Sequence, residues 1–88
     1  MHEQATIRDL VRTVEHVATE NDATRVVSIK VRLGALSHFT PEHFLEHWQD
    51  ATGGTIAEGS AVESELSEDL TDPNAHGVIL EDVEIALD

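Results

Sequence analysis

The chain of 88 residues contains no cysteine. This absence excludes disulfide bonds, thiolate nucleophiles, iron–sulfur clusters and zinc sites built on cysteine. Any metal ion must therefore be held by histidine, carboxylate or backbone atoms. A phosphate-binding loop is also missing, because Gly53, Gly54 and Gly59 have neither its spacing nor its lysine. We expect that this chain does not hydrolyse nucleotides.

Basic residues are scarce. Five lysine and arginine residues stand against 18 acidic residues, which gives a formal net charge of -13. A field of this sign repels nucleic-acid phosphates and anionic lipid headgroups, so neither nucleic acid nor a membrane is an expected partner. Lys30 is the single lysine, and this acid-rich balance is typical of a halophilic protein, for which high salt screens the self-repulsion.

Long apolar runs are also missing. No run approaches the ~20 residues that span a bilayer, and no charged start followed by an apolar stretch indicates a signal peptide. The sequence therefore predicts a soluble, cytoplasmic protein. We expect residues 1–88 to form a single small domain with one core.

Hydrophobic periodicity predicts two helices. The first covers residues 3–20 and is predicted to end at Asn21-Asp22. The second begins at Thr40-Pro41-Glu42, which offers a side-chain cap, a proline for the first helical position and an acid near the positive helix end, and it ends at Gly53-Gly54. The predicted buried residues are Ile7, Leu10, Val11, Val14, Val17 and Ala18 in the first helix, and Phe44, Leu45, Trp48 and Ala51 in the second.

Alternating apolar and polar residues predict three strands, at residues 26–33, 61–66 and 78–87, with a bulge or bend near Glu81. A polar, acidic loop, residues 67–77, joins the last two strands. The order helix, strand, helix, strand, strand predicts an α+β fold, a three-stranded sheet with two helices packed on it. The side chains predicted to face inward are Val27, Ile29, Val31, Leu33, Val62, Leu66, Val83, Ile85 and Leu87.

The first three residues, Met1-His2-Glu3, are a candidate metal site. A bulky residue at position two leaves the initiator Met1 in place, so the ligands begin with a free amine. The Met1 amine, the His2 backbone nitrogen, the His2 imidazole and the Glu3 backbone nitrogen can lie in one plane, and tetragonal nitrogen ligands favour Ni(II) or Cu(II) over zinc. The alternative is that His2 is simply a solvated terminal residue.

Several segments occur together in an order that is typical of one family. They are Met1-His2-Glu3 before an amphipathic helix, residues 27–37 (VSIKVRLGALS), Pro41-Glu42, residues 54–59 (GTIAEG) and residues 80–85 (LEDVEI). In their order and spacing the chain resembles the HypA nickel metallochaperones of hydrogenase maturation.

The resemblance implies nickel delivery, and not catalysis. It implies Ni(II) bound by Met1, His2 and Glu3, and delivered with a partner GTPase to the precursor of NiFe hydrogenase or, in some organisms, to urease. Family members normally carry a zinc-binding lobe with two cysteine pairs between the last two strands. Residues 67–77 stand in its place here, so no zinc site is carried over. A metal-independent, acidic protein-interaction module derived from the same fold stays open as an alternative, and the oligomeric state is not predicted.

Other candidate residues have simpler interpretations. His43 and His47 share one face of the second predicted helix and are close enough to ligate one metal as a second or transit site, but both also fit the solvent margin of the core. Paired carboxylates such as Glu63 and Glu65 are expected to form a solvated face. Trp48 is expected to pack in the core and not to anchor an interface. The histidines without a partner at ligand spacing, expected at the surface, are His16, His38 and His76.

Overall fold

The computed structural model of the chain describes the backbone of residues 2–87 and the side chains of residues 4–87. Its elements, in order, are α1 (His2–Glu20), β1 (Arg25–Leu33), α2 (Pro41–Thr52), β2 (Ala61–Leu66) and β3 (Val78–Ala86). The predicted α+β class and the predicted order are confirmed, and every bound lies within a residue or two of the prediction. Neither α1 nor α2, the helices of the described residues, has the length and apolarity that crossing a membrane requires.

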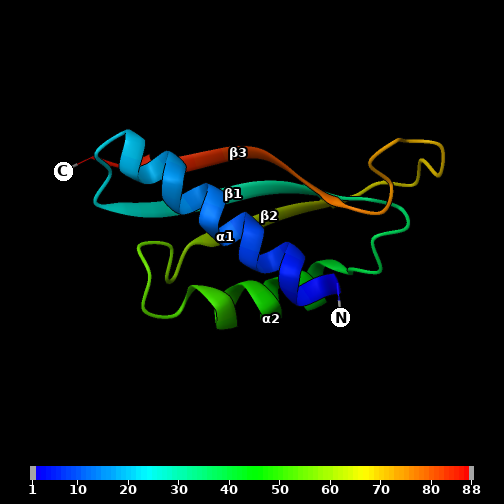
Figure 1. Ribbon diagram of the computed structural model, residues 1–88, viewed down its shortest axis with the longest axis horizontal. Coiled ribbons are helices and arrows are strands. Elements are labelled where there is room, and N and C mark those ends of the chain that lie inside the picture. The colour runs from blue at the N-terminus through cyan, green and yellow to red at the C-terminus, as the bar shows by residue number, and fades with distance from the viewer. Residues whose placement is uncertain (1, 88) are drawn as a thin grey trace.

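The sheet has β1 at its centre, in the order β2-β1-β3 (Figure 1). β1 pairs in parallel with β2 and antiparallel with β3. Parallel neighbours need a crossover connection, and α2 supplies it. Both helices pack on one face of the sheet, because a single core cluster contains residues of α1, β1 and α2.

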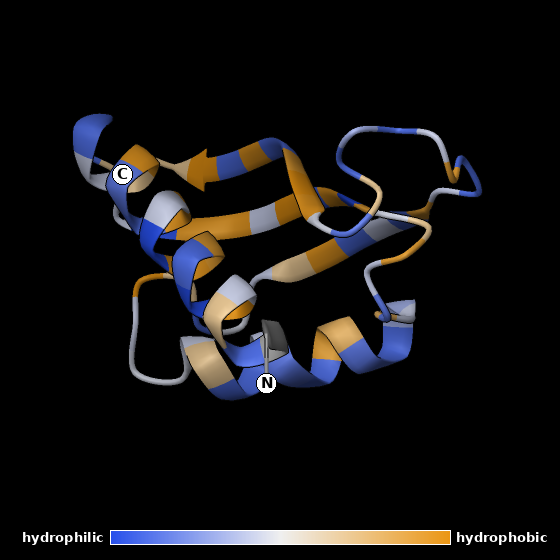
Figure 2. Ribbon diagram, turned by 45° about the vertical axis from the view of Figure 1, so that its right-hand side comes forward, coloured by the Kyte–Doolittle hydropathy of each residue, from blue (hydrophilic) through white to orange (hydrophobic). Residues whose placement is uncertain are grey.

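Apolar and polar residues alternate along the strands (Figure 2), and the two faces of the sheet differ in polarity. Ile29 and Val31 of β1 are buried beneath the helices, while Lys30 between them is exposed on the other side. That outer face also carries Glu63 and Asp82 from the two edge strands, around a shallow hollow that Lys30 helps to line. This alternation is what an antiparallel or mixed sheet with one solvated face requires.

Trp48 lies at the centre of the core with no exposed surface, as predicted. Its indole Nε1 donates a hydrogen bond of 2.9 Å to Ser60 Oγ, and that hydroxyl donates one of 2.6 Å to the carbonyl oxygen of Ala57. The Phe44 ring stacks beside the indole, with ring centroids 6.2 Å apart. These contacts attach the segment between α2 and β2 to the buried side of α2.

Two β-bulges interrupt the pairing of β1 with β3. Lys30 pairs with Asp82 but Val31 pairs with Leu80, so Glu81 is the extra residue that the sequence predicted. At the other bulge Val27 is extra and half-buried. Its predicted place in the buried row was wrong, because an inserted residue inverts the alternation of a strand. Val26, which is 1% exposed, fills the core there instead.

The helix α2 begins at the predicted cap, where Thr40 Oγ1 accepts a hydrogen bond of 3.1 Å from the His43 backbone nitrogen. Gly53 follows the last residue of the helix, and Gly54 adopts a positive φ of 81°. Glycine adopts this left-handed conformation without the steric penalty that other residues meet. The predicted start and end of this helix are therefore confirmed.

Four further predictions of buried residues were wrong, each at the margin of the core. Leu87 is 65% exposed, because it follows Ala86, the last residue of β3. Leu45 is 37% exposed and Ala51 is exposed, because α2 presents to the sheet only a narrow stripe that includes Trp48 and Thr52. Leu66 is 50% exposed, because it ends an edge strand beyond the area that the helices cover.

Residues 67–77 connect β2 to β3 and pack against the end of β1. The backbone nitrogen of Gly34 donates to the carbonyl oxygen of Gly77 at 2.9 Å, and Ala75 is 2% exposed. A Cβ atom on Gly34 would contact the carbonyl oxygen of Ala75 and lie 2.7 Å from that of Gly77. Glycine at this position therefore allows two backbone segments to approach closely.

Inside this connection, short side chains order the backbone. The hydroxyl and the backbone nitrogen of Thr71 both donate to Asp69 Oδ1, at 2.7 and 2.9 Å, and these bonds lower the pKa of Asp69 from its ordinary value. Asp72 Oδ1 accepts from the backbone nitrogen of Asn74 at 2.9 Å. Such side-chain turns fix a conformation that contains neither helix nor strand.

Candidate metal centre

The predicted metal site lies at the start of α1. His2 is the first residue of that helix. Met1 and the side chains of His2 and Glu3 lie outside the described residues, so the structure does not place the predicted ligands. The assignment of nickel to Met1, His2 and Glu3 therefore stays a prediction.

The backbone at this end has a property that suits metal ligation. The first four N–H groups of an α-helix have no acceptor within the helix. Because α1 begins at His2, the backbone nitrogens of His2 and Glu3 belong to that set. A metal can replace their protons without breaking a hydrogen bond of the helix. Among the described side chains, the buried stripe of α1 begins at Ile7, one turn further on.

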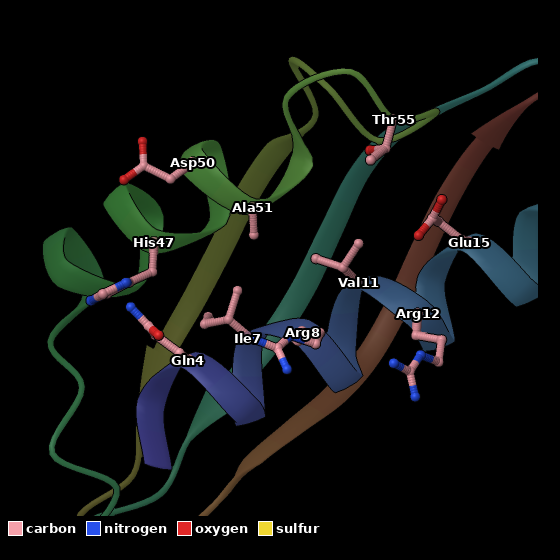
Figure 3. Close-up of a pocket in the computed structure, with 10 residues that line it drawn as sticks. All are labelled: Gln4, Ile7, Arg8, Val11, Arg12, Glu15, His47, Asp50, Ala51 and Thr55. Atoms are coloured by element: carbon pink, nitrogen blue, oxygen red, sulfur yellow. The ribbon is translucent and has the colours of Figure 1, made fainter. Parts of the chain in front are cut away.

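A groove of about 500 Å³ runs between α1 and α2, close to the start of α1. Figure 3 shows Gln4 and His47 near one another at one end of it, with Ile7 and Val11 along its α1 side. The start of α1 and the middle of α2 thus border the same groove. The charged residues that line it are of both signs: Arg8, Arg12, Glu15 and Asp50.

His43 and His47 come together on α2. Their Nε2 atoms are 2.9 Å apart and their ring centroids 4.5 Å apart, and both residues are half-buried. The spacing of four residues predicted this pairing. It did not predict Phe39, whose ring centroid lies 5.9 Å from that of His43 and 6.2 Å from that of His47. Phe39 precedes α2, so helical periodicity gives no signal for this contact.

The three remaining histidines among the described side chains are exposed, as predicted: His16, His38 and His76. One of them has a partner that the sequence reasoning missed, because His16 Nε2 lies 3.3 Å from Glu20 Oε1 across one turn of α1. Glu63 and Glu65 are exposed, as expected of a solvated face. Over the described side chains, residues 4–87, no three or more histidine, aspartate and glutamate residues are grouped in a way that holds a metal ion.

Comparison with known proteins identifies relatives with this sequence pattern. Residues 1–71 match the family model described as "Hydrogenase/urease nickel incorporation, metallochaperone, hypA". The hydrogenase maturation factor HypA of Methylocella silvestris is 39% identical over 66 residues, which cover 75% of this chain and 58% of that protein. HypA of Archaeoglobus fulgidus is 38% identical over 63 residues, which cover 72% of this chain and 57% of that protein. The chain thus spans a little over half the length of these relatives.

The fold has a solved counterpart. The solution structure of the Ni metallochaperone HypA from Helicobacter pylori superposes with a TM-score of 0.76, over 98% of each chain at 12% sequence identity. That likeness confirms the fold, while the sequence matches define the relationship. A match over residues 1–71, together with relatives at 38 and 39% identity across about three quarters of the chain, shows that this protein belongs to the HypA family.

Proposed function

We propose that this protein is a nickel metallochaperone that supplies Ni(II) during the maturation of a nickel enzyme such as NiFe hydrogenase. The observation that carries the proposal is the family match, which begins at residue 1 and so includes Met1-His2-Glu3. The description of the family names nickel incorporation into hydrogenase and urease. The relatives at 38 and 39% identity are named hydrogenase maturation factors.

In this proposal the amino terminus holds the nickel ion. The Met1 amine, the His2 backbone nitrogen and the His2 imidazole, with the backbone nitrogen of Glu3, form a set of nitrogen donors that suits square-planar Ni(II). Two of these donors are backbone nitrogens at the start of α1, where helix formation does not use the amide protons. The ion is cargo, so the site must also release it.

Nickel passes to the precursor of the nickel enzyme with the help of a maturation GTPase, and the chain acts by binding and transfer without catalysing a reaction. Residues 67–77 take the place of the family's zinc-binding lobe. The net charge of -13 supports a location in a cytoplasm at high salt.

The direct test is calorimetric titration of the untagged chain with Ni(II) at neutral pH, beside a His2→Gln variant. Glutamine is chosen because a bulky second residue keeps Met1 in place, so the variant loses only the imidazole. We expect the tightest nickel site to require His2, and a visible absorption band of square-planar Ni(II) to appear in the unaltered chain only. Equal affinity and equal spectra for both proteins would contradict the proposal.

A second comparison separates the amine from the imidazole. A chain extended by several residues without histidine ahead of Met1 keeps the imidazole but turns the Met1 amine into a peptide nitrogen. We expect this extension to remove the square-planar spectrum as completely as His2→Gln does. Transfer of nickel to an apo-hydrogenase large subunit is then measured with all three proteins, and transfer by the extended chain at the full rate would argue against the amino-terminal site.

A further inference from the structure

Two imidazole rings face each other on α2, outside the site proposed above. His43 Nε2 and His47 Nε2 are 2.9 Å apart, and the ring planes are inclined by 60°. In the ligand-free chain this contact is a hydrogen bond in which one ring donates and the other accepts. The spacing of four residues on a helix is also the spacing at which two histidines chelate one metal ion.

The rings have fixed positions because the core holds them from one side. Phe39 is 4% exposed and packs edge-on against Phe44, with centroids 5.6 Å apart. The same Phe39 ring contacts both His43 and His47. The two imidazoles are therefore half-buried and pre-positioned, which reduces the conformational entropy that a flexible surface pair loses on binding a metal.

The distance between the two nitrogens indicates which coordination geometry they fit. Imidazole nitrogens lie about 2.0–2.1 Å from a bound divalent metal, so two of them are about 2.9 Å apart at a right angle and about 3.3 Å apart at a tetrahedral angle. The observed separation of 2.9 Å is that of the hydrogen bond between the rings, and it also equals the separation that ligation at a right angle requires, so the pair reaches this geometry by turning the rings. Adjacent positions at right angles occur in tetragonal and octahedral complexes, which Ni(II) and Cu(II) prefer and structural zinc does not.

We propose that His43 and His47 form a second metal site, separate from Met1-His2-Glu3, that binds Ni(II) or Cu(II) through two adjacent imidazole ligands. Binding uses both Nε2 lone pairs, so the ring that donates the present hydrogen bond moves that proton to its own Nδ1, and both rings turn slightly toward the metal. The proton therefore stays on the pair when both rings start neutral. This site does not depend on the function proposed for the amino terminus.

The site is expected to be open and exchangeable. No third histidine or carboxylate of residues 4–87 joins the pair in a metal-binding group, so water or an incoming ligand fills the remaining positions. His47 also borders the groove between α1 and α2 that Gln4 lines, two residues after His2. An ion on this pair would lie beside the groove that leads to the start of α1. The net charge of the chain favours cations at either place.

The test uses the full chain carrying His2→Gln, so that the amino-terminal imidazole does not contribute. Ni(II) and Cu(II) salts are titrated calorimetrically into this protein and into the same protein with His43→Gln or His47→Gln added. We expect one metal equivalent in the parent and an affinity about tenfold lower, or weaker, in either variant, because each removes one of two ligands. His16→Gln is the matched control, since His16 is a helical histidine with a partner one turn away and is exposed. It should leave the affinity unchanged.

A second measurement needs no substitution within the pair. Cu(II) is added in small amounts to the His2→Gln chain, and the loss of the histidine ring signals is followed by nuclear magnetic resonance. The signals of His43 and His47 should broaden first and together. The proposal is overturned if other histidines broaden before this pair, or if the affinity is unchanged by both His43→Gln and His47→Gln. An equal loss of affinity in His16→Gln would overturn it as well. One metal equivalent that is retained in the His2→Gln chain and lost when His43→Gln is added would support this pair, whatever the outcome at the amino terminus.

Discussion

Replacing Ser60 by alanine should destabilise the fold, because the buried indole N–H of Trp48 then has no hydrogen-bond acceptor. Ser60 Oγ is the acceptor for the buried indole N–H of Trp48, and both residues lie in the core. The carbonyl oxygen of Ala57 loses the Ser60 hydroxyl but keeps a hydrogen bond of 3.1 Å from the Ser60 backbone nitrogen. The dominant effect is therefore the unpaired N–H group, which costs about 1–3 kcal/mol of unfolding free energy.

The assay is urea denaturation followed by Trp48 fluorescence and by circular dichroism, supplemented by thermal unfolding. For a domain of this size, a loss in the middle of that range lowers the midpoint temperature by about 10 °C. Ser28→Ala is the control, because its hydroxyl bonds to Glu84 on the exposed face of the sheet, and it should change the stability by no more than about 0.5 kcal/mol.

A double-mutant cycle isolates the hydrogen bond from the loss of the hydroxyl. In a Trp48→Phe background no indole N–H exists, so Ser60→Ala should cost about 1 kcal/mol less there than in the unaltered chain. Equal losses in the two backgrounds would refute the reasoning, as would a loss below about 0.5 kcal/mol for Ser60→Ala alone. Circular dichroism followed in parallel keeps the comparison valid when the fluorophore is removed.

Three further predictions concern the 67–77 connection, salt and pH. Gly34→Ala should lower the unfolding free energy by about 1–3 kcal/mol in urea denaturation, because its methyl group meets the backbone of Ala75 and Gly77. Gly53→Ala, whose added Cβ meets nothing nearer than 3.9 Å, should change it by no more than about 0.5 kcal/mol, and equal effects of the two changes would be inconsistent with the close approach. Raising the NaCl concentration should raise the thermal midpoint, because salt screens the repulsion that a net charge of -13 produces, and a midpoint that falls or stays constant would count against this. Finally, nickel affinity of the untagged chain should decline below about pH 6, because protons compete for the His2 imidazole and the amine, whereas an affinity independent of pH in a calorimetric series would exclude these ligands.

The sequence predicted the helices and strands better than it predicted how the strands pair in the sheet. Apolar spacing defined both helices and all three strands, because each element buries one face and the period of the burial is visible in the residues. It did not predict that β1 lies between β2 and β3, since strand order depends on contacts between distant segments. The bulge at Glu81 was predictable from broken alternation, whereas the bulge at Val27 was hidden because Val26 and Val27 are both apolar.

The candidate sites, too, could be predicted from the sequence only in part. The spacing of His43 and His47 predicted that they share a helix face, because the geometry of an α-helix is fixed within one turn. The contact of both rings with Phe39 was not predictable, because the path of the chain before α2 is set by tertiary packing. The amino-terminal site was predicted mainly by family resemblance, since a histidine at position two carries little information by itself.

Metal binding at the start of α1, as proposed, should change the folding stability of the chain little. Among the described side chains, the buried stripe of this helix runs from Ile7 to Ala18, at least one turn beyond the proposed ligands. Little packing energy is lost when the first turn of α1 rearranges, because its described side chains, Gln4 and Ala5, are exposed and the first backbone N–H groups of a helix have no helical acceptor. Under the proposed function, the amino-terminal ligands would rearrange around nickel while residues from Ile7 onward stay in place. Ile7 and Val11, which line the groove between α1 and α2, would stay in place as well. An ion released at the start of α1 would then reach His47, which borders the same groove.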